Sequence, residues 1–338
     1  MKILLVEYIT GGGLVDAPLP PGLVHEGELM QRALLTDLLA LEGLEIAITR
    51  DYRLFQESIA AQQWNVKQYV INCGDDLLQL LPELLDRFDA LWPIAPESKH
   101  ILQEICRVAE SAGKILLNSS SEVVEIAGDK RKTCARLKQH SIQTVPCYPF
   151  SANRKYEARL QVLKPCDGVG STNVYLLVDQ GDYQRLRMTL PDPGNYILQP
   201  YIQGRALSLC CLFSNGRGWL LSCNEQHIEI TAGRFELLAC KVNVQADADA
   251  CKQIIGRIAM AMPQLWGYAG IDIIESDTGY WVVEINPRLT SSYAGLRAAL
   301  GINVAGLVLG LLKGPVEITP FCDNTMVINI AEECCHAS

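Results

Sequence analysis

The first 117 residues alternate short apolar runs with segments in which apolar residues recur at helical spacing. The apolar runs predict strands at residues 3–6, 45–49, 66–73, 90–93 and 114–117. The segments between them predict helices at residues 26–42, 77–85 and 98–112. Strands that alternate with helices in this way are typical of a parallel sheet with helices on its faces. We therefore expect an open α/β domain over residues 1–117.

Three consecutive glycines, Gly11–Gly13, follow the first predicted strand. Open α/β sheets commonly bind ligands at this end of a strand. The run does not match the Gly-x-Gly-x-x-Gly fingerprint, and no helix is predicted directly after it, so a dinucleotide-dependent dehydrogenase is disfavoured. A flexible turn before the proline-rich segment 17–21 and a substrate-binding loop remain equally good interpretations.

The pattern changes after a capping signal at residues 118–121. Long alternating segments later in the chain predict an antiparallel sheet, with a hairpin that turns at residues 276–279. From this change we predict two further lobes, at residues 118–195 and 196–338. The predicted helices begin near Gly128 and at Ala248, and the predicted strands lie at residues 161–165, 196–199, 207–213, 219–223, 237–244, 268–274 and 280–287.

Composition and charge narrow the range of possible functions and partners. The chain has 338 residues, a formal net charge of −9 and no lysine- or arginine-rich block, which disfavours nucleic-acid and anionic-membrane partners. Thirteen cysteines, mostly single within apolar runs and never spaced Cys-x-x-Cys, favour a reducing compartment over disulfides or zinc, with residues 334–336 taken as a tail. The N-terminal apolar run meets Glu7 too early for a signal peptide, and residues 304–312 are too few to span a bilayer. We expect a cytoplasmic protein that acts on small molecules.

Three oxygen donors are predicted to share one face of the C-terminal hairpin. Glu284 and Asn286 are two positions apart on a strand, and Asp272 reaches the same face from the neighbouring strand. Carboxylates among Ile, Val and Trp side chains are costly unless a cation compensates them. A few protein oxygens completed by phosphates suit Mg²⁺ or Mn²⁺. The alternative is a buried salt bridge between Glu284 and Arg288.

Two lysines could meet this metal site. Lys164 ends a strand before a loop that contains Gly168, Gly170 and Ser171, whose N–H groups can fold over phosphate oxygens. Lys130 opens a helix after Gly128. Either lysine alone would be read as a solvated surface charge. In combination with the oxygen donors, they predict a triphosphate site.

The order and spacing of these residues resemble the ATP-grasp superfamily over about residues 118–312. The resemblance implies an α/β ATP-grasp fold, in which a Rossmann-like (pre-ATP-grasp) domain precedes two lobes that clamp ATP. It implies that Lys130 and Lys164 contact the phosphates, that the three oxygen donors hold two divalent ions, and that Arg288 lies near the transferred phosphoryl group. The connector would offer backbone groups to adenine, and its residues are Gln199, Pro200, Tyr201 and Ile202.

Two positions depart from the superfamily pattern. Gln199 stands where relatives often carry Glu, and backbone recognition of adenine would survive this change. Ala206 stands where a ribose-binding carboxylate is common. Glu225 or a residue elsewhere is the candidate replacement.

Both ends of the chain also resemble a narrower family, the tyramine–glutamate ligases of methanofuran biosynthesis and their bacterial relatives in one-carbon metabolism. The resemblance lies in residues 7–13, 26–30 and 286–293. It implies that an acyl phosphate forms on the γ-carboxylate of glutamate and passes the acyl group to the amine of tyramine or tyrosine. Arg288 would stabilise the oxyanion, and the loop at residues 168–171 would close as a lid.

Several residues and functions stay open. Residues 290–293 are candidates for donor binding or for helix capping. Candidates on the acceptor side, with surface or structural roles as alternatives, are Asp16, His25, Glu26 and Arg50. An ATP-grasp kinase and a non-catalytic ATP-sensing module are the alternative functions. The oligomeric state is open, with a homodimer as one alternative.

Overall fold

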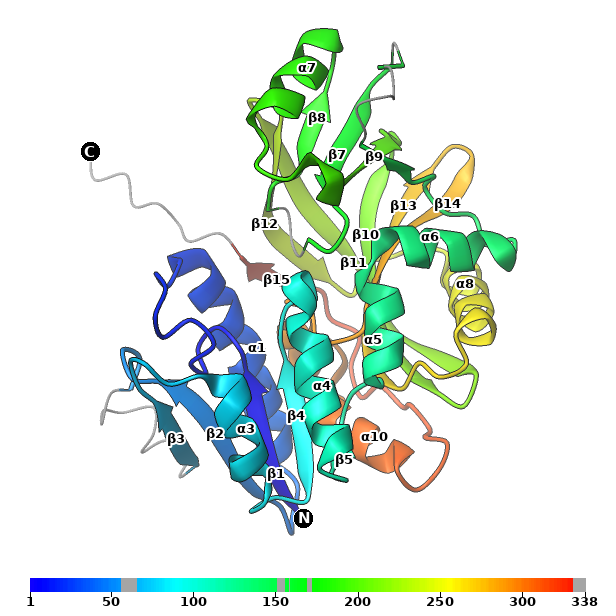
Figure 1. The fold of residues 1–338 in the computed structure, drawn as a ribbon. Coiled ribbons are helices and arrows are strands. Elements are labelled where there is room, and N and C mark those ends of the chain that lie inside the picture. Colours follow the sequence, from blue (N-terminus) through cyan, green and yellow to red (C-terminus); the bar gives the residue numbers. More distant parts are fainter. Residues whose placement is uncertain (56–65, 151–155, 158, 169–171, 331–338) are drawn as a thin grey trace, which may run out of the picture.

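The fold is taken from a computed structural model, which describes residues 1–55, 66–150, 156–157, 159–168 and 172–330 (Figure 1). Two predicted phosphate-loop residues, Gly170 and Ser171, lie outside the described residues, as does the tail at residues 334–336.

The N-terminal domain is built on a parallel five-stranded sheet in the order β3-β2-β1-β4-β5. Successive side chains along β1 point to opposite faces of the sheet, which explains why helices cover both faces. Ile3 and Leu5 pack with α1, and Leu4 and Val6 pack with α3 and α4. The predicted parallel sheet is confirmed. The elements are β1 (Lys2–Glu7), α1 (Pro21–Leu39), β2 (Glu45–Asp51), β3 (Lys67–Ile71), α3 (Leu77–Leu85), β4 (Ala90–Ile94), η1 (Ser98–His100), α4 (Ile101–Ser111) and β5 (Ile115–Leu116).

Two helices differ from the prediction. Helix α1 begins at Pro21 rather than near residue 26, because proline at the first helical position needs no N–H partner and has a suitable φ. The helix predicted for residues 98–112 is interrupted at its start. Lys99 and His100 adopt φ values of 54° and 60°, and the regular helix begins only at Ile101.

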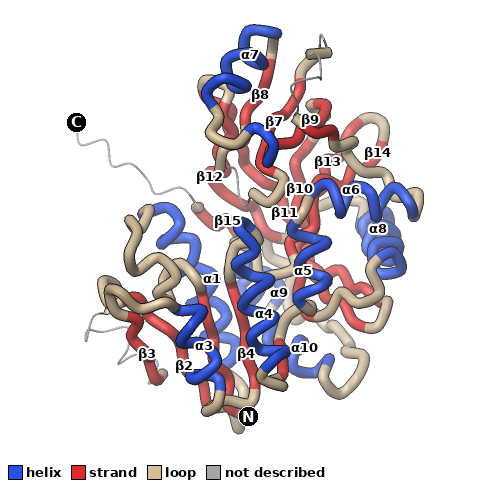
Figure 2. Tube along the Cα trace, viewed as in Figure 1, coloured by secondary structure: helices blue, strands red, loops and turns tan. Residues whose placement is uncertain are grey.

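The second sheet has ten strands, and its longest described strand, β11, forms a hairpin with β12 (Figure 2). Strand β11 runs well beyond the predicted residues 219–223. Through β12, which pairs with β8 at Arg234 and Tyr175, the hairpin joins the strands of the two lobes. The strands are β6 (Tyr148–Pro149), β7 (Gln161–Pro165), β8 (Tyr175–Leu177), β9 (Tyr196–Pro200), β10 (Arg205–Ser214), β11 (Arg217–Thr231), β12 (Arg234–Val242), β13 (Gly267–Ser276), β14 (Gly279–Asn286) and β15 (Met326–Asn329).

Of the remaining helices, α7 packs against the small-lobe strands β7, β8 and β9, and α5, α6, α8, α9 and α10 cover both faces of the large-lobe strands. Leu207, Leu209 and Ile271 share a core with α5, α6 and α8. On the other face, α9 and α10 share a core with α1 of the N-terminal domain, which brings that domain against the large lobe. These helices are α5 (Ser121–Gly128), α6 (Lys130–Gln139), α7 (Gln180–Thr189), η2 (Pro193–Asn195), α8 (Ala248–Ala261), α9 (Tyr293–Leu300) and α10 (Val304–Leu311).

The division at residues 117/118 and 195/196 stays a proposal. Strand β9 begins at Tyr196 and pairs with β7 and β6, so the second boundary falls directly before a strand of the preceding sheet region. Within the described residues, no single helix is long and apolar enough to cross a membrane. Helices α9 and α10 reach that length only as a pair bent by 104°, and both contribute buried residues to the core.

Candidate functional site

A cavity of about 450 Å³ lies between β7 and β9 on one side and the strands β10, β13 and β14 on the other. It brings together every described residue that the sequence placed at the phosphate, connector and metal positions, although the role of each stays a prediction. These lining residues are Lys130, Lys164, Gly168, Gln199, Pro200, Tyr201, Ile202, Asp272, Glu284, Asn286 and Arg288.

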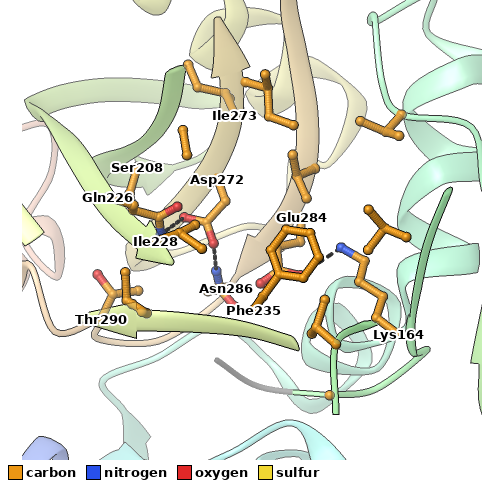
Figure 3. A pocket seen from close by; sticks show the side chains of 18 of the residues that line it. Lys164, Ser208, Gln226, Ile228, Phe235, Asp272, Ile273, Glu284, Asn286 and Thr290 are labelled. Atoms are coloured by element: carbon orange, nitrogen blue, oxygen red, sulfur yellow. Dashed lines mark hydrogen bonds and ion pairs between the residues drawn. The ribbon is translucent and has the colours of Figure 1, made fainter. Parts of the chain in front are cut away.

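The oxygen donors lie on one face of the β13–β14 hairpin (Figure 3). Alternation accounts for Glu284 and Asn286, and a register shift between Asp272 and Ile273 brings Asp272 to the same face. Asp272 is directly opposite Glu284 in the antiparallel register, and Asn286 is opposite Gly270. The Asn286 amide donates to Asp272 Oδ2 over 3.3 Å, and Gln226 Nε2 donates to Asp272 Oδ1 over 3.3 Å. Asp272 is therefore held by neutral amide groups on both of its oxygens.

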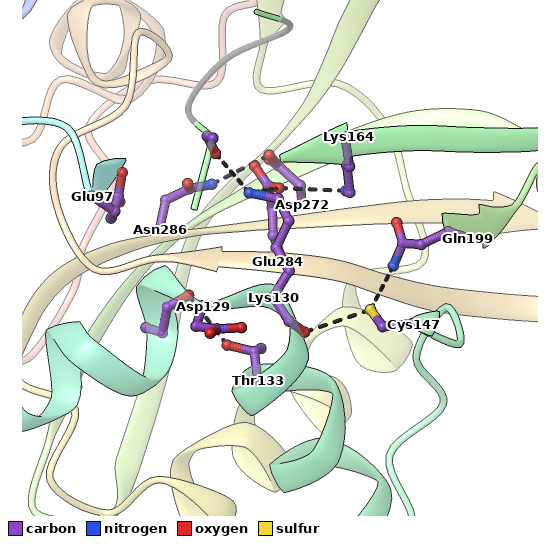
Figure 4. Close-up of polar contacts among 12 residues, drawn as sticks. Glu97, Asp129, Lys130, Thr133, Cys147, Lys164, Gln199, Asp272, Glu284 and Asn286 are labelled. Carbon is purple, nitrogen blue, oxygen red and sulfur yellow. Dashed lines mark hydrogen bonds and ion pairs between the residues drawn. The ribbon is translucent and has the colours of Figure 1, made fainter. Parts of the chain in front are cut away.

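Both lysines converge on Glu284 (Figure 4). Lys130 Nζ lies 3.1 Å and Lys164 Nζ lies 3.6 Å from Glu284 Oε2, and the two lysine side chains are only 7% and 8% exposed. Lys130 also donates from Nζ to the Gly168 carbonyl over 2.6 Å. The interpretation of each lysine as a solvated surface charge is therefore wrong.

Arg288 does not take Glu284 as its hydrogen-bonded partner. Its Nε donates to both carboxylate oxygens of Glu97, over 3.0 and 3.1 Å. The alternative of a simple Glu284–Arg288 salt bridge therefore does not hold. Glu97 follows β4 at the carboxyl edge of the parallel sheet, and the sequence analysis missed it. Its position after a buried strand was the available signal.

The charges in the cavity are unevenly compensated. Burial and then the neighbouring Glu284 raise the pKa of Asp272. Burial also acts to raise the pKa of Glu284, but Lys130 and Lys164 together outweigh it and hold that pKa below its usual range. Burial lowers the pKa of Lys164, and Glu284 opposes this shift. A cation beside Asp272 would relieve the repulsion between the two carboxylates.

The donor set fits a hard divalent cation, with two carboxylates and an amide oxygen on one strand pair. Among the described residues, no group of three or more His, Cys, Asp and Glu side chains is arranged to hold a metal. A metal in this cavity would therefore depend on the amide oxygen of Asn286 and on ligands from outside the protein.

In the connector, the Gln199 side chain is used within the fold. Its Nε2 donates to the Val145 carbonyl over 3.3 Å and contacts Cys147 Sγ at 3.0 Å. The Tyr201 N–H donates to the Leu160 carbonyl over 3.1 Å. Ile202 also lines the cavity, and contact of the connector backbone with adenine stays a prediction.

Ala206 and Glu225 both line the cavity. Glu225 lies on β11 opposite Leu207, the residue that follows Ala206 on β10. A carboxylate is thus available on the strand next to the position where the superfamily pattern has one. Glu225 remains the candidate for the ribose contact.

The segment after β14 divides between cavity and core. Thr290, Ser291 and Ser292 line the cavity, and the Ser291 hydroxyl donates to the Glu26 carboxylate, which also lines it. Tyr293 instead donates its hydroxyl to Asp37 over 2.7 Å and is 2% exposed. This hydrogen bond links α9 to α1, so the assignment of Tyr293 to donor binding is not supported.

Of the four acceptor-side candidates, Glu26 alone lines this cavity among the described residues. Asp16 accepts from the Gly74 N–H over 2.9 Å, and Arg50 pairs with Glu28. His25 Nε2 lies 3.3 Å from the Asn329 carbonyl oxygen. These contacts favour structural roles for Asp16, His25 and Arg50.

Replacing Tyr293 with Phe should lower the free energy of unfolding by about 1–2 kcal/mol, because Asp37 loses a buried hydrogen-bond donor. Arg297, whose Nη1 lies 2.8 Å from Asp37 Oδ1, still compensates the carboxylate charge. Urea denaturation measures this loss, and steady-state kinetics should show unchanged KM values. A large rise in the KM for the carboxylate substrate would return Tyr293 to the binding site.

Comparison with known proteins agrees with the fold. A model of the ATP-grasp domain matches residues 127–292, and a model of the pre-ATP-grasp domain matches residues 44–124. Tyramine–L-glutamate ligases from Methanocaldococcus fervens and Methanocaldococcus jannaschii are 25% and 26% identical over 298 residues, covering 87% of this chain and 89% and 84% of theirs.

Two solved structures share the fold. A putative ATP-grasp superfamily protein from Archaeoglobus fulgidus has a TM-score of 0.72 at 21% identity, covering 97% of this chain and 92% of its own. An L-amino acid ligase from Bacillus licheniformis has a TM-score of 0.68 at 16% identity, with 94% and 75% covered. The two domain models and the tyramine–L-glutamate ligase relatives show that the chain belongs to the ATP-grasp superfamily and is an enzyme of its carboxylate–amine ligase type.

Proposed function

We propose that the protein is an ADP-forming ligase that joins the γ-carboxylate of glutamate to the amine of tyramine or tyrosine, in the biosynthesis of a methanofuran-type cofactor. The observation that carries this proposal is the convergence of Lys130, Lys164 and three oxygen donors on one cavity. The substrates are proposed from the similarity to tyramine–L-glutamate ligases over most of both chains.

ATP would lie with its phosphates between the lysines and the hairpin. Lys130 and Lys164 supply the positive charge, and the loop with Gly168, Gly170 and Ser171 supplies N–H groups. Adenine would lie against the connector at residues 199–202. The cavity volume is in the range common for small-molecule sites, about 300–1,000 Å³.

Two divalent ions, Mg²⁺ or Mn²⁺, would be held by Asp272, Glu284 and Asn286. When bound, they would supply positive charge beside the phosphates. The raised pKa of Asp272 supports this assignment, because burial and the neighbouring Glu284 outweigh the hydrogen bond from Ser208 and the charge of Lys164.

The first chemical step joins a carboxylate oxygen to the γ-phosphorus of ATP and breaks the bond to ADP. Two anions must approach each other, and Lys130 and Lys164 reduce this repulsion. The product is an acyl phosphate, which water would hydrolyse. Burial of the lysines to 7% and 8% exposure is consistent with a site that limits water.

In the second step, the uncharged amine attacks the acyl carbon, and the tetrahedral oxyanion collapses to the amide with release of phosphate. The amine nitrogen loses a proton, which ends on the released phosphate, so that the products are the amide and hydrogen phosphate. Arg288 lines the cavity and is the candidate to stabilise the oxyanion, a contact typically worth about 3–4 kcal/mol.

A phosphate-release screen tests this function. The protein is incubated with Mg-ATP, glutamate and a panel of amines headed by tyramine and tyrosine. We expect ADP, phosphate and an amide product only when both substrates are present. A phosphorylated product formed without amine would indicate a kinase, and nucleotide binding without turnover would indicate a sensor.

A further inference from the structure

The segment that follows β4 in the N-terminal domain contacts two other parts of the site. Glu97 binds Arg288, which follows β14 in the large lobe. Two residues later, the Lys99 N–H donates to Asp167 Oδ2 over 3.0 Å, and Asp167 belongs to the loop after Lys164. One short segment thus touches both the candidate oxyanion group and the candidate phosphate loop.

The Glu97–Arg288 pair is buried and has a defined geometry. The Glu97 side chain is 5% exposed and the Arg288 side chain is 11% exposed. Both Glu97 oxygens accept from Nε, while Nη1 donates to the Leu289 carbonyl over 2.9 Å. Because Nε and Nη1 are engaged, Nη2 is the guanidinium nitrogen best placed to serve a substrate oxygen.

Glu97 stands behind Arg288 rather than in the cavity. In the described part of the chain, Arg288 lines the cavity and Glu97 does not. In Figure 4, Glu97 lies beyond Asn286, on the side away from Lys164. Helix α5 approaches Glu97 closely, since a Cβ at Gly128 would lie only 3.0 Å from Glu97 Cβ. Within the described residues, the carboxylate of Glu97 contacts the site through Arg288 Nε.

We propose that Glu97 is a positioning residue, through which the N-terminal domain sets the orientation of the Arg288 guanidinium for the acyl-transfer reaction. This inference rests on the proposed ligase function. A long arginine side chain has many rotamers, and a buried carboxylate bound to Nε selects those in which Nε faces Glu97 and Nη2 is left for a substrate oxygen. Lys99 and His100 in this segment have left-handed φ values. Such a strained backbone persists where surrounding contacts hold it in place.

The test is a kinetic comparison of Glu97→Gln with the wild type and with Glu104→Gln. Glu104 is the matched control, because it is an α4 carboxylate paired with Arg107 in an exposed position. Glu97→Gln should lower kcat about 10- to 100-fold, as loss of a supporting partner commonly does, with the KM for ATP unchanged. Glu104→Gln should keep wild-type kcat.

A double-mutant cycle separates positioning from a general structural role. If Glu97 acts through Arg288, adding Glu97→Gln to an Arg288→Gln variant should change kcat less than about twofold. Losses that multiply in the double variant would overturn the proposal. The double variant also removes both charges, so neither is left buried without a partner.

Should Glu97→Gln fail to fold, Glu97→Asp carries the test, because it keeps the charge and shortens the reach. A several-fold lower kcat with unchanged KM for ATP supports positioning, and an unchanged kcat overturns it. The proposed function is judged separately. Wild-type protein without amine-dependent ADP release would contradict the ligase assignment, whereas an active wild type with equally active Glu97 variants would contradict only the positioning role.

Discussion

Replacing Glu284 with Gln should lower ADP formation by at least about 10²- to 10³-fold. Glu284 is the proposed metal ligand that also contacts both lysines, at 3.1 and 3.6 Å. The amide keeps the shape of the side chain but removes its negative charge. The metal would lose a carboxylate ligand, and the lysines would lose the group that orients them. Coupled-enzyme detection of ADP at saturating Mg-ATP measures the effect.

The same substitution should lower the stability of the ligand-free protein. Lys130 and Lys164 would be left buried without their shared carboxylate, and breaking a buried ion pair in this way typically costs about 3–5 kcal/mol. Glu236, an exposed residue of β12, provides the matched control, and Glu236→Gln should keep wild-type activity and Tm. Full ADP formation by a folded Glu284→Gln variant would contradict the metal and phosphate assignment.

Replacing Lys164 with Met should lower kcat/KM for ATP by about 10²-fold, because one of two cations facing the phosphates is lost. Methionine fills a similar volume, so the packing of β7 should be kept. Glu284 would retain Lys130 as its partner, and we expect no comparable loss of stability. Both Glu284→Gln and Lys164→Met should therefore lower the activity, but Glu284→Gln should lower the Tm more.

Initial rates over a range of ATP concentrations, together with thermal unfolding of the ligand-free protein, measure both parts of this prediction. Lys241→Met is the control, since Lys241 is exposed on β12. An unchanged kcat/KM in Lys164→Met, with kcat/KM for Lys241→Met also normal, would remove Lys164 from the nucleotide site.

The hairpin that carries the oxygen donors could be predicted from the sequence because its pairing is local. Strand alternation and a short turn at residues 276–279 predicted the hairpin, but regular pairing from this turn would set Asp272 opposite Val283. A register shift between Asp272 and Ile273 sets Asp272 opposite Glu284 instead, and the local pattern did not predict it. The same local signals predicted the parallel sheet and the start of helix α6 at Lys130. The convergence of Lys130 and Lys164 on Glu284 needed the superfamily resemblance in addition, since spacing along the chain does not fix distances between lobes.

Other features depend on contacts between distant segments, and the local pattern could not supply them. The Arg288–Glu97 pair joins residues from different domains, and the sequence suggested only Glu284 as an alternative partner for Arg288. The sequence placed Tyr293 beside a candidate binding segment, but its hydroxyl donates to Asp37 on the distant helix α1. The outer half of β11 is too polar to stand out as a strand, and it is held by pairing with β12.

The central claim is that two lysines and three oxygen donors surround one triphosphate. Its most direct test is a crystal structure with a non-hydrolysable ATP analogue and Mn²⁺, in which anomalous scattering locates the ions. We expect manganese between the phosphates and the side chains of Asp272, Glu284 and Asn286, with Lys130 Nζ and Lys164 Nζ bound to phosphate oxygens. A nucleotide bound elsewhere, or anomalous peaks away from these three side chains, would contradict the account.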